Sequence, residues 1–203
     1  MYAVRYITLA CLLAAAPSWA RAQSLDPNVG TCLHKSGDES IVACTAVIGS
    51  GLHSGKILSL AFYNRAFAYF EHKDYVRAMA DFNKAILLDP KNADAYVGRG
   101  TGYLLQNNNV AAIADFSKVI LLDPKSEVAF NNRGYSYLEQ KDYGRAITDY
   151  SDAIRLNPQN AKAFFARGLA KSKLGHPVDA KADMDHALIL DPKVAEGFKS
   201  WMH

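Results

Sequence analysis

Apolar and polar residues follow a helical period along this chain, and the pattern itself recurs every 34 residues. Apolar residues three and four positions apart form one stripe along a helix. A proline after an aspartate or asparagine closes each unit, at Pro90, Pro124, Pro158 and Pro192. Proline lacks an N–H group and biases the preceding residue away from the helical region, so it separates neighbouring units. We therefore predict helix pairs over 59–92, 93–126, 127–160 and 161–194.

The same kinds of side chain occupy equivalent positions in all four units. An aromatic residue opens the first helix, a very small residue follows four positions later, and an alanine begins the apolar stripe of the second helix. These three columns are Phe62, Tyr96, Phe130 and Phe164; Ala66, Gly100, Gly134 and Gly168; and Ala78, Ala112, Ala146 and Ala180. Small residues let two helices approach closely. A single hairpin cannot bury its own apolar face, so neighbouring units must stack.

These columns resemble the tetratricopeptide repeat over about residues 59–194. The resemblance implies an all-α, right-handed superhelical solenoid of antiparallel helix pairs. It also implies a concave groove that is lined by the first helices and that holds the ligand. Residues 195–203 are predicted to form a segment that caps the last apolar face, because solenoids require capped ends.

Two charged columns depart from the general pattern of the family. Arginine stands where leucine is common, and aspartate recurs in step on the second helices. These residues are Arg65, Arg99, Arg133 and Arg167, with Asp81, Asp115, Asp149 and Asp183. One interpretation is a set of structural ion pairs, because a partly buried arginine needs a carboxylate partner. The other is a row of arginines offered to an anionic ligand.

Residues 23–58 are predicted to form a degenerate helical hairpin with its turn at Gly37–Asp38. Cys32 and Cys44 each lie six residues from Asp38, so they can face each other across the hairpin. A pair of cysteines in an exported chain indicates a disulfide. The alternative is two small core residues, since free cysteine also buries readily. Residues 49–55 are predicted to be a flexible loop, four residues longer than the register allows.

The first 22 residues have the order of a secretory signal: Arg5, a short apolar run over 7–16, Pro17 and small residues before Gln23. A retained anchor, or a lipoprotein modified at Cys11, is the alternative, and only then would the chain contact a membrane. Cleavage lowers the basic residues from 23 to 21 against 20 acidic ones. This balance disfavours nucleic-acid binding. The signal and the cysteine pair predict an exported, periplasmic protein, and the family resemblance implies a Gram-negative cell.

Catalytic and cofactor signals are weak. The segment 49–56 (GSGLHSGK) has the wrong spacing for a phosphate-binding loop, and Ile57 replaces the expected hydroxyl residue. The six histidines are scattered, with no pair four residues apart, and are interpreted as solvated side chains. No nucleophile, base and orienting group occur together. We therefore expect no enzyme activity, no cofactor and no metal.

The predicted partner site is the groove face of the first helices, which is apolar and aromatic for a surface. It comprises Leu60, Tyr63, Phe67, Val97, Thr101, Asn131, Asn132, Tyr135, Phe165 and Leu169. Capture of a terminal carboxylate is not expected, because Val128 stands where a basic residue would be needed. The chain is thus predicted to be a monomeric adaptor that binds an apolar helix or segment of an envelope protein. The alternative is a self-associating scaffold of the envelope.

Overall fold

The computed structural model describes residues 26–201, and there it consists of ten α-helices and one terminal 3-10 helix, without strands. The predicted all-α fold of consecutive helix pairs is confirmed. The predicted signal, residues 1–22, lies outside the described residues. The chain divides into two compact units, one up to Asn92 and one from Ala93 onward.

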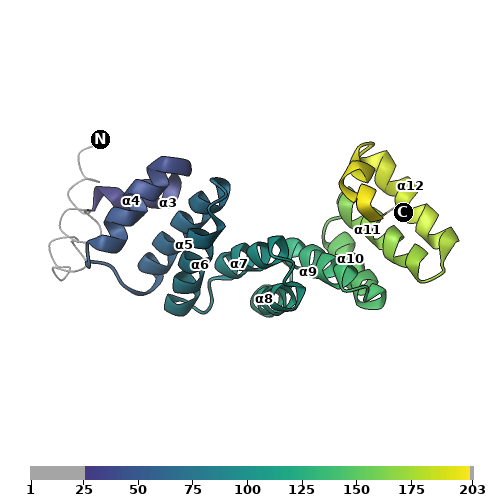
Figure 1. The fold of residues 1–203 in the computed structure, drawn as a ribbon, viewed down its shortest axis with the longest axis horizontal. Helices are drawn as coiled ribbons and strands as arrows, with labels where there is room; N and C mark the ends of the chain where they lie inside the picture. The colour runs from purple at the N-terminus through teal and green to yellow at the C-terminus, as the bar shows by residue number, and fades with distance from the viewer. Residues whose placement is uncertain (1–25, 202–203) are drawn as a thin grey trace, which may run out of the picture. The chain divides into compact units, whose positions relative to one another are not determined.

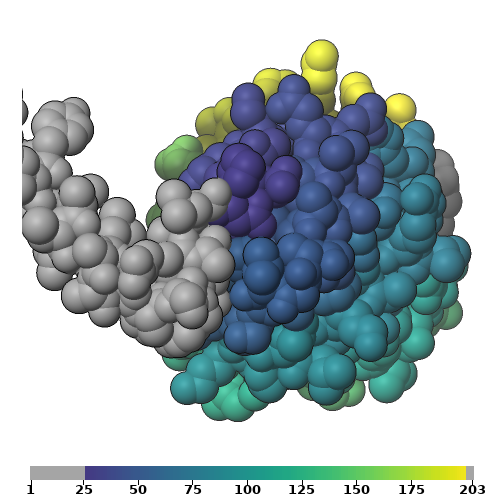
Figure 2. Space-filling model, turned by 90° about the vertical axis from the view of Figure 1, so that its left-hand side faces the viewer, coloured from purple at the N-terminus to yellow at the C-terminus, as the bar shows by residue number. Residues whose placement is uncertain are grey.

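The first unit holds four helices: α3 (Pro27–His34), α4 (Gly37–Gly49), α5 (Gly55–Glu71) and α6 (Tyr75–Leu88). Each helix packs on the next one in the sequence, and α3 also contacts α5 (Figure 1). In the space-filling view the purple surface of α3 adjoins the blue surface of the helices that follow it (Figure 2).

The second unit holds α7 (Ala93–Leu105), α8 (Asn109–Leu122), α9 (Glu127–Glu139), α10 (Tyr143–Leu156), α11 (Ala161–Lys173), α12 (Pro177–Leu190) and η1 (Val194–Trp201). The first helices α7, α9 and α11 contact one another in turn, and each packs against its own second helix. The segment η1 returns onto α11 and α12 (Figure 1).

The residue before each boundary proline ends its helix in an extended conformation, as proline demands. Its side chain then accepts a hydrogen bond from the backbone N–H two residues on. The four bonds are 2.9–3.1 Å long and join Asp89 to Lys91, Asp123 to Lys125, Asn157 to Gln159 and Asp191 to Lys193. The recurring Asp-Pro is therefore a compact turn that closes one repeat and starts the next.

Two glycines of the first helices are required by close approach to the second helix. A Cβ atom on Gly134 would lie 3.1 Å from the Tyr150 ring. A Cβ atom on Gly168 would lie 2.9 Å from the backbone oxygen of Ala180, which cannot rotate away. The small column predicted from the sequence thus sets the distance between paired helices.

Each arginine of the charged column forms a bidentate ion pair with the aspartate 16 residues later. Nε and Nη2 donate to the two carboxylate oxygens at 2.7–3.0 Å in all four pairs. In three repeats Nη1 also donates to a hydroxyl of the preceding second helix: Thr45, Ser117 and Ser151 receive bonds from Arg65, Arg133 and Arg167. This geometry supports the structural interpretation of the columns.

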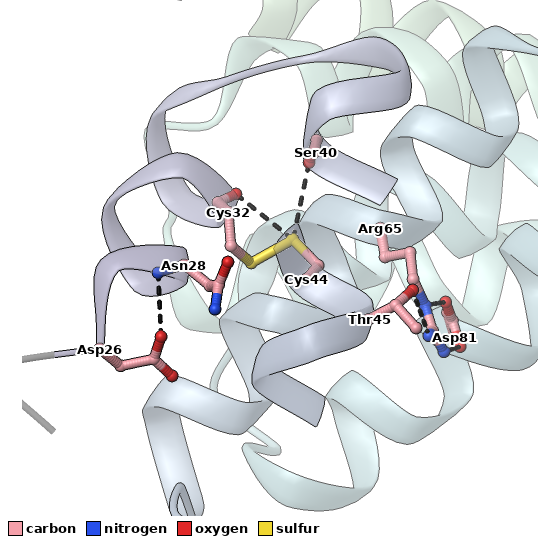
Figure 3. Close-up of a disulfide and its surroundings, with 8 residues drawn as sticks. All are labelled: Asp26, Asn28, Cys32, Ser40, Cys44, Thr45, Arg65 and Asp81. Carbon is pink, nitrogen blue, oxygen red and sulfur yellow. Dashed lines mark hydrogen bonds and ion pairs between the residues drawn. A yellow bond between two sulfur atoms is a disulfide. The ribbon is translucent and has the colours of Figure 1, made fainter. Parts of the chain in front are cut away.

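A disulfide joins Cys32 to Cys44 in the first unit, and both residues are fully buried (Figure 3). Their Cα atoms are 4.7 Å apart, within the normal range for a disulfide. The turn lies at Lys35–Ser36 rather than at the predicted Gly37–Asp38, because α4 already begins at Gly37.

The loop between α4 and α5 is held in place by a buried histidine. His53 is 5% exposed and lies 2.9 Å, Nε2 to Oδ2, from Asp26, the residue that caps α3. The prediction that the histidines are solvated is therefore wrong for His53. The loop was predicted to be flexible, but this contact anchors it to the start of α3.

Candidate partner-binding groove

Helix α5, the first helix of the repeat over 59–92, presents an apolar surface. Leu60 is 39% exposed and Phe67 is 46% exposed, seven residues apart on α5. Tyr63 lies between them, half-buried, with its ring centroid 6.5 Å from that of Phe67 and 6.1 Å from that of Phe82. The structure thus brings these three predicted residues together on one face of α5.

The two predicted residues on α7 expose less of their side chains to a partner. Val97 and Thr101 are both half-buried, and the Thr101 hydroxyl donates to the backbone oxygen of Val97 at 2.8 Å. That hydrogen bond is local to the helix. Thr101 can therefore contribute shape to a binding face, whereas its hydroxyl is already engaged.

The three predicted residues on α9 line a real concavity. Asn131, Asn132 and Tyr135 face a pocket of about 370 Å³ between α9, α11 and η1. Its other lining residues are Tyr150, Lys162, Ala166, Asp191, Lys193, Val194, Gly197 and Phe198. A pocket of this size with mixed apolar and polar walls is typical of a binding site.

The pocket carries more positive than negative charge. No ion pair involves Lys162 or Lys193 in the part of the chain that the structure describes, whereas Asp191 accepts a hydrogen bond from the backbone of Lys193. Lys162 of the neighbouring first helix α11 thus lines the same pocket as Asn132, although the sequence analysis found no basic partner for this asparagine.

Tyr150 is a pocket residue that is absent from the predicted site. It comes from the second helix α10 and is 1% exposed, yet its hydroxyl has no hydrogen-bond partner among the described residues. Its ring lies across Gly134, and only the missing side chain there permits this position. The equivalent residues Phe82 and Phe116 carry no hydroxyl. The signal in the sequence for this pocket residue is that Tyr150 stands where the two preceding repeats have phenylalanine.

Both tyrosines of the pocket remain protonated near neutral pH. Burial, aided by a hydrogen bond to Glu139, raises the pKa of Tyr135 to about 12. Burial also raises the pKa of Tyr150. Each phenol is therefore a hydrogen-bond donor, and Asn131 adds a buried amide oxygen without a partner in the described structure.

Two predicted groove residues on α11 are covered by the chain itself. Phe165 is 3% exposed and Leu169 is 4% exposed, and η1 packs onto the same helix, α11. The Phe198 ring lies 5.2 Å from the Phe165 ring, centroid to centroid. The prediction that Phe165 and Leu169 offer an open surface is wrong for this conformation.

The described residues show neither a metal-binding group nor a membrane span. No cluster of three or more His, Cys, Asp or Glu side chains is arranged to hold an ion in residues 26–201. Over the same range, no helix has both the length and the apolarity needed to cross a bilayer.

Two stretches match models of repeat families. Residues 59–92 match a tetratricopeptide repeat, and residues 134–175 match a TPR repeat. No curated protein matches the chain by sequence.

Solved structures share the fold. A crystal structure of MamA aligns with a TM-score of 0.69 and 23% identity, covering 78% of this chain and 91% of that one. The first TPR domain of Spaghetti (RPAP3), bound to the HSP90 peptide SRMEEVD, aligns with a TM-score of 0.59 and 21% identity, covering 61% and 98%. The Arabidopsis OM64 TPR domain aligns with a TM-score of 0.56 and 27% identity, covering 58% and 97%.

Proposed function

We propose that this chain, which belongs to the tetratricopeptide-repeat family, is a non-enzymatic adaptor. It would dock a segment of another protein on its first helices. The tetratricopeptide fold supports protein–protein interaction in general. The observation that carries the specific proposal is the α5 surface, where Leu60 and Phe67 are large apolar side chains exposed beside Tyr63. Exposed apolar surface of this kind marks an interaction site, and aromatic residues bury much area with few rotatable bonds.

The partner that fits this surface is a short apolar helix or extended segment. Helix-in-groove recognition uses anchors at helical spacing, and Leu60, Tyr63 and Phe67 are themselves three and four residues apart. The RPAP3 domain in complex with an HSP90 peptide supports docking of a peptide segment by this fold.

The compartment we propose is the periplasm. The signal-like order of residues 1–22 supports export, and the disulfide between Cys32 and Cys44 supports an oxidising environment. The partner would then be a protein of the cell envelope. Mass spectrometry of the protein recovered from a periplasmic fraction tests this proposal, and the expected new N-terminus is Gln23.

The test of the adaptor function is affinity capture from envelope extracts with the chain from Gln23 onward. The variant Leu60→Ala/Phe67→Ala removes exposed side chains, so the fold should persist while partner recovery falls. The matched control is Val76→Ala/Leu87→Ala, which removes two exposed aliphatic side chains from α6 of the same hairpin. Equal recovery of every partner by the wild-type chain and both variants would exclude the α5 face. Light scattering on the free protein separates the expected monomer from a self-associating scaffold.

A further inference from the structure

The segment η1 is built differently from the helices that it covers. It is a 3-10 helix interrupted at Phe198, where φ is −121°. Its backbone bonds are local, from Val194 to Asp191 and from Glu196 to Lys193. No side-chain hydrogen bond or ion pair joins residues 194–199 to another helix within the described structure. By contrast, α11 and α12 are joined by the Arg167–Asp183 pair.

Two side chains anchor η1, and they lie four positions apart. Val194 is 4% exposed and Phe198 is 9% exposed, whereas Glu196 and Lys199 of the same segment are exposed. The Phe198 ring packs against Phe165. An aliphatic and an aromatic residue with this spacing are what a short docking helix presents to a groove.

The segment η1 does not fill the space between itself, α9 and α11. The pocket of about 370 Å³ lies between η1, α9 and α11, and it contains the unpartnered Tyr150 hydroxyl. The pocket is partly open to solvent, so η1 leaves room for further side chains beside it on the face of α11.

We infer that residues 194–201 are a resident and displaceable occupant of the groove face of α11, and thus an autoinhibitory contact. The partner segment that replaces them carries an aliphatic and an aromatic residue four positions apart, in the places of Val194 and Phe198. This inference rests on the proposed adaptor function and specifies the chemistry of the segment that docks on α11 of the second unit. While η1 is bound, only the fraction of molecules with an open groove binds the partner, so the apparent Kd is raised.

The test uses the full chain and a fluorescein-labelled peptide with the sequence of residues 194–201, followed by fluorescence anisotropy. The variant Phe198→Ala weakens the resident segment, so it should bind the peptide at least tenfold more tightly than the wild-type chain. The control Glu196→Ala alters an exposed residue of the same segment and should match the wild type. A peptide with alanine in place of its phenylalanine should bind none of the three proteins. Equal affinity of the wild type and Phe198→Ala for the peptide, including no binding by either, would overturn the inference.

A second measurement on the wild-type chain remains decisive if Phe198→Ala folds poorly. Hydrogen exchange should show the η1 amides opening at least a hundredfold more often than the amides of α11. Exchange of η1 and α11 together, only through unfolding of the whole second unit, would identify η1 as a fixed cap. Loss of partner capture in Leu60→Ala/Phe67→Ala would still support the adaptor function in that case, so the two proposals can fail separately.

Discussion

Arg133 and Asp149 are joined by two parallel hydrogen bonds, each 2.8 Å long, with the carboxylate almost fully buried. The pair links α9 to α10 within one repeat. The remaining guanidinium nitrogen, Nη1, reaches Ser117 of the preceding second helix at 3.0 Å. One side chain therefore ties three helices together.

Replacement of Asp149 by alanine should destabilise the second unit, because it leaves the half-buried guanidinium of Arg133 without its carboxylate. Breaking such a pair lowers the free energy of unfolding by about 3 kcal/mol. Urea unfolding followed by circular dichroism measures this change. The control is Asp152→Ala, whose carboxylate pairs with Arg155 at the surface, where a change of under about 1 kcal/mol is expected. Equal effects of the two variants would contradict the structural role.

Alanine should be tolerated less well at Gly168 than at Gly134. The new Cβ atom would meet the Ala180 backbone oxygen at 2.9 Å in the first case and a tyrosine ring at 3.1 Å in the second. A ring can shift by a few tenths of an ångström, whereas a helix backbone resists. We expect Gly168→Ala to cost about 2–3 kcal/mol and Gly134→Ala about 1 kcal/mol in thermal unfolding. The reverse order would show that the helices part more easily at α11 and α12.

The variant Tyr150→Phe should be at least as stable as the wild-type protein. The Tyr150 hydroxyl is buried without a partner in the described structure, and such a group costs about 1 kcal/mol or more. The predicted gain in the free energy of unfolding is thus up to about 1 kcal/mol. Tyr137→Phe serves as the comparison, because this tyrosine is also buried, at 9% exposed, yet lies outside the pocket. A clear loss of stability in Tyr150→Phe would mean that the hydroxyl is satisfied in solution.

The sequence predicted the repeated positions well, because the spacing of apolar residues, small residues and proline is a local property that a single chain displays directly. The Arg–Asp columns followed from the same register, whereas the cysteine pair was predicted from its spacing about Asp38, although the turn lies at Lys35–Ser36. Phe165 and Leu169 could not be placed in this way. Their register position puts them on the groove face, but only tertiary packing decides that Phe198 returns to cover that face.

Two other residues show the limit of pattern reading. Tyr150 is buried in the core and still reaches the pocket, because Gly134 leaves room for its ring. His53 lies in a polar loop and is nevertheless buried, since Asp26 supplies a carboxylate 27 residues earlier in the sequence. Local composition does not identify Gly134 as the neighbour of Tyr150 or Asp26 as the partner of His53.

Acid should destabilise the second unit partly through Asp183. Burial favours a higher pKa for this carboxyl, but hydrogen bonds from Arg167 and Lys171 outweigh it, so the folded-state pKa lies below the ordinary value of 3.8. The unfolded chain therefore takes up the proton more readily. The stabilisation is present above about pH 4 and is lost as the pH falls through the folded-state pKa.

Urea unfolding between about pH 5 and pH 2 measures this effect. Asp183→Asn should be less stable than the wild type at neutral pH and should lose less of its stability on acidification. The exposed Asp179→Asn is the control and should keep the wild-type slope. An unchanged acid slope in Asp183→Asn would contradict the assignment.

Reduction of the Cys32–Cys44 disulfide should loosen the first unit and leave the second unit unchanged. The bond closes a loop of 12 residues and fixes α3, which has only eight residues and is too short to be stable alone. Closing a loop of this length stabilises a fold by about 3 kcal/mol. Hydrogen exchange with and without a reductant should show faster opening of α3 and α4. The variant Cys32→Ala/Cys44→Ala should behave like the reduced wild type and ignore the reductant.

The hydroxyl bonds of Arg65, Arg133 and Arg167 all point toward the preceding second helix, which gives the solenoid a direction. For these three arginines the hydroxyl residue comes 16 to 20 residues earlier in the sequence, and the aspartate comes 16 residues later. Removal of repeats from the carboxyl end leaves every remaining arginine of these three with its hydroxyl partner. Removal of repeats from the amino end takes that hydroxyl away from the first arginine that remains. Shortened versions of this protein should therefore be made by removing one hairpin at a time from the carboxyl end.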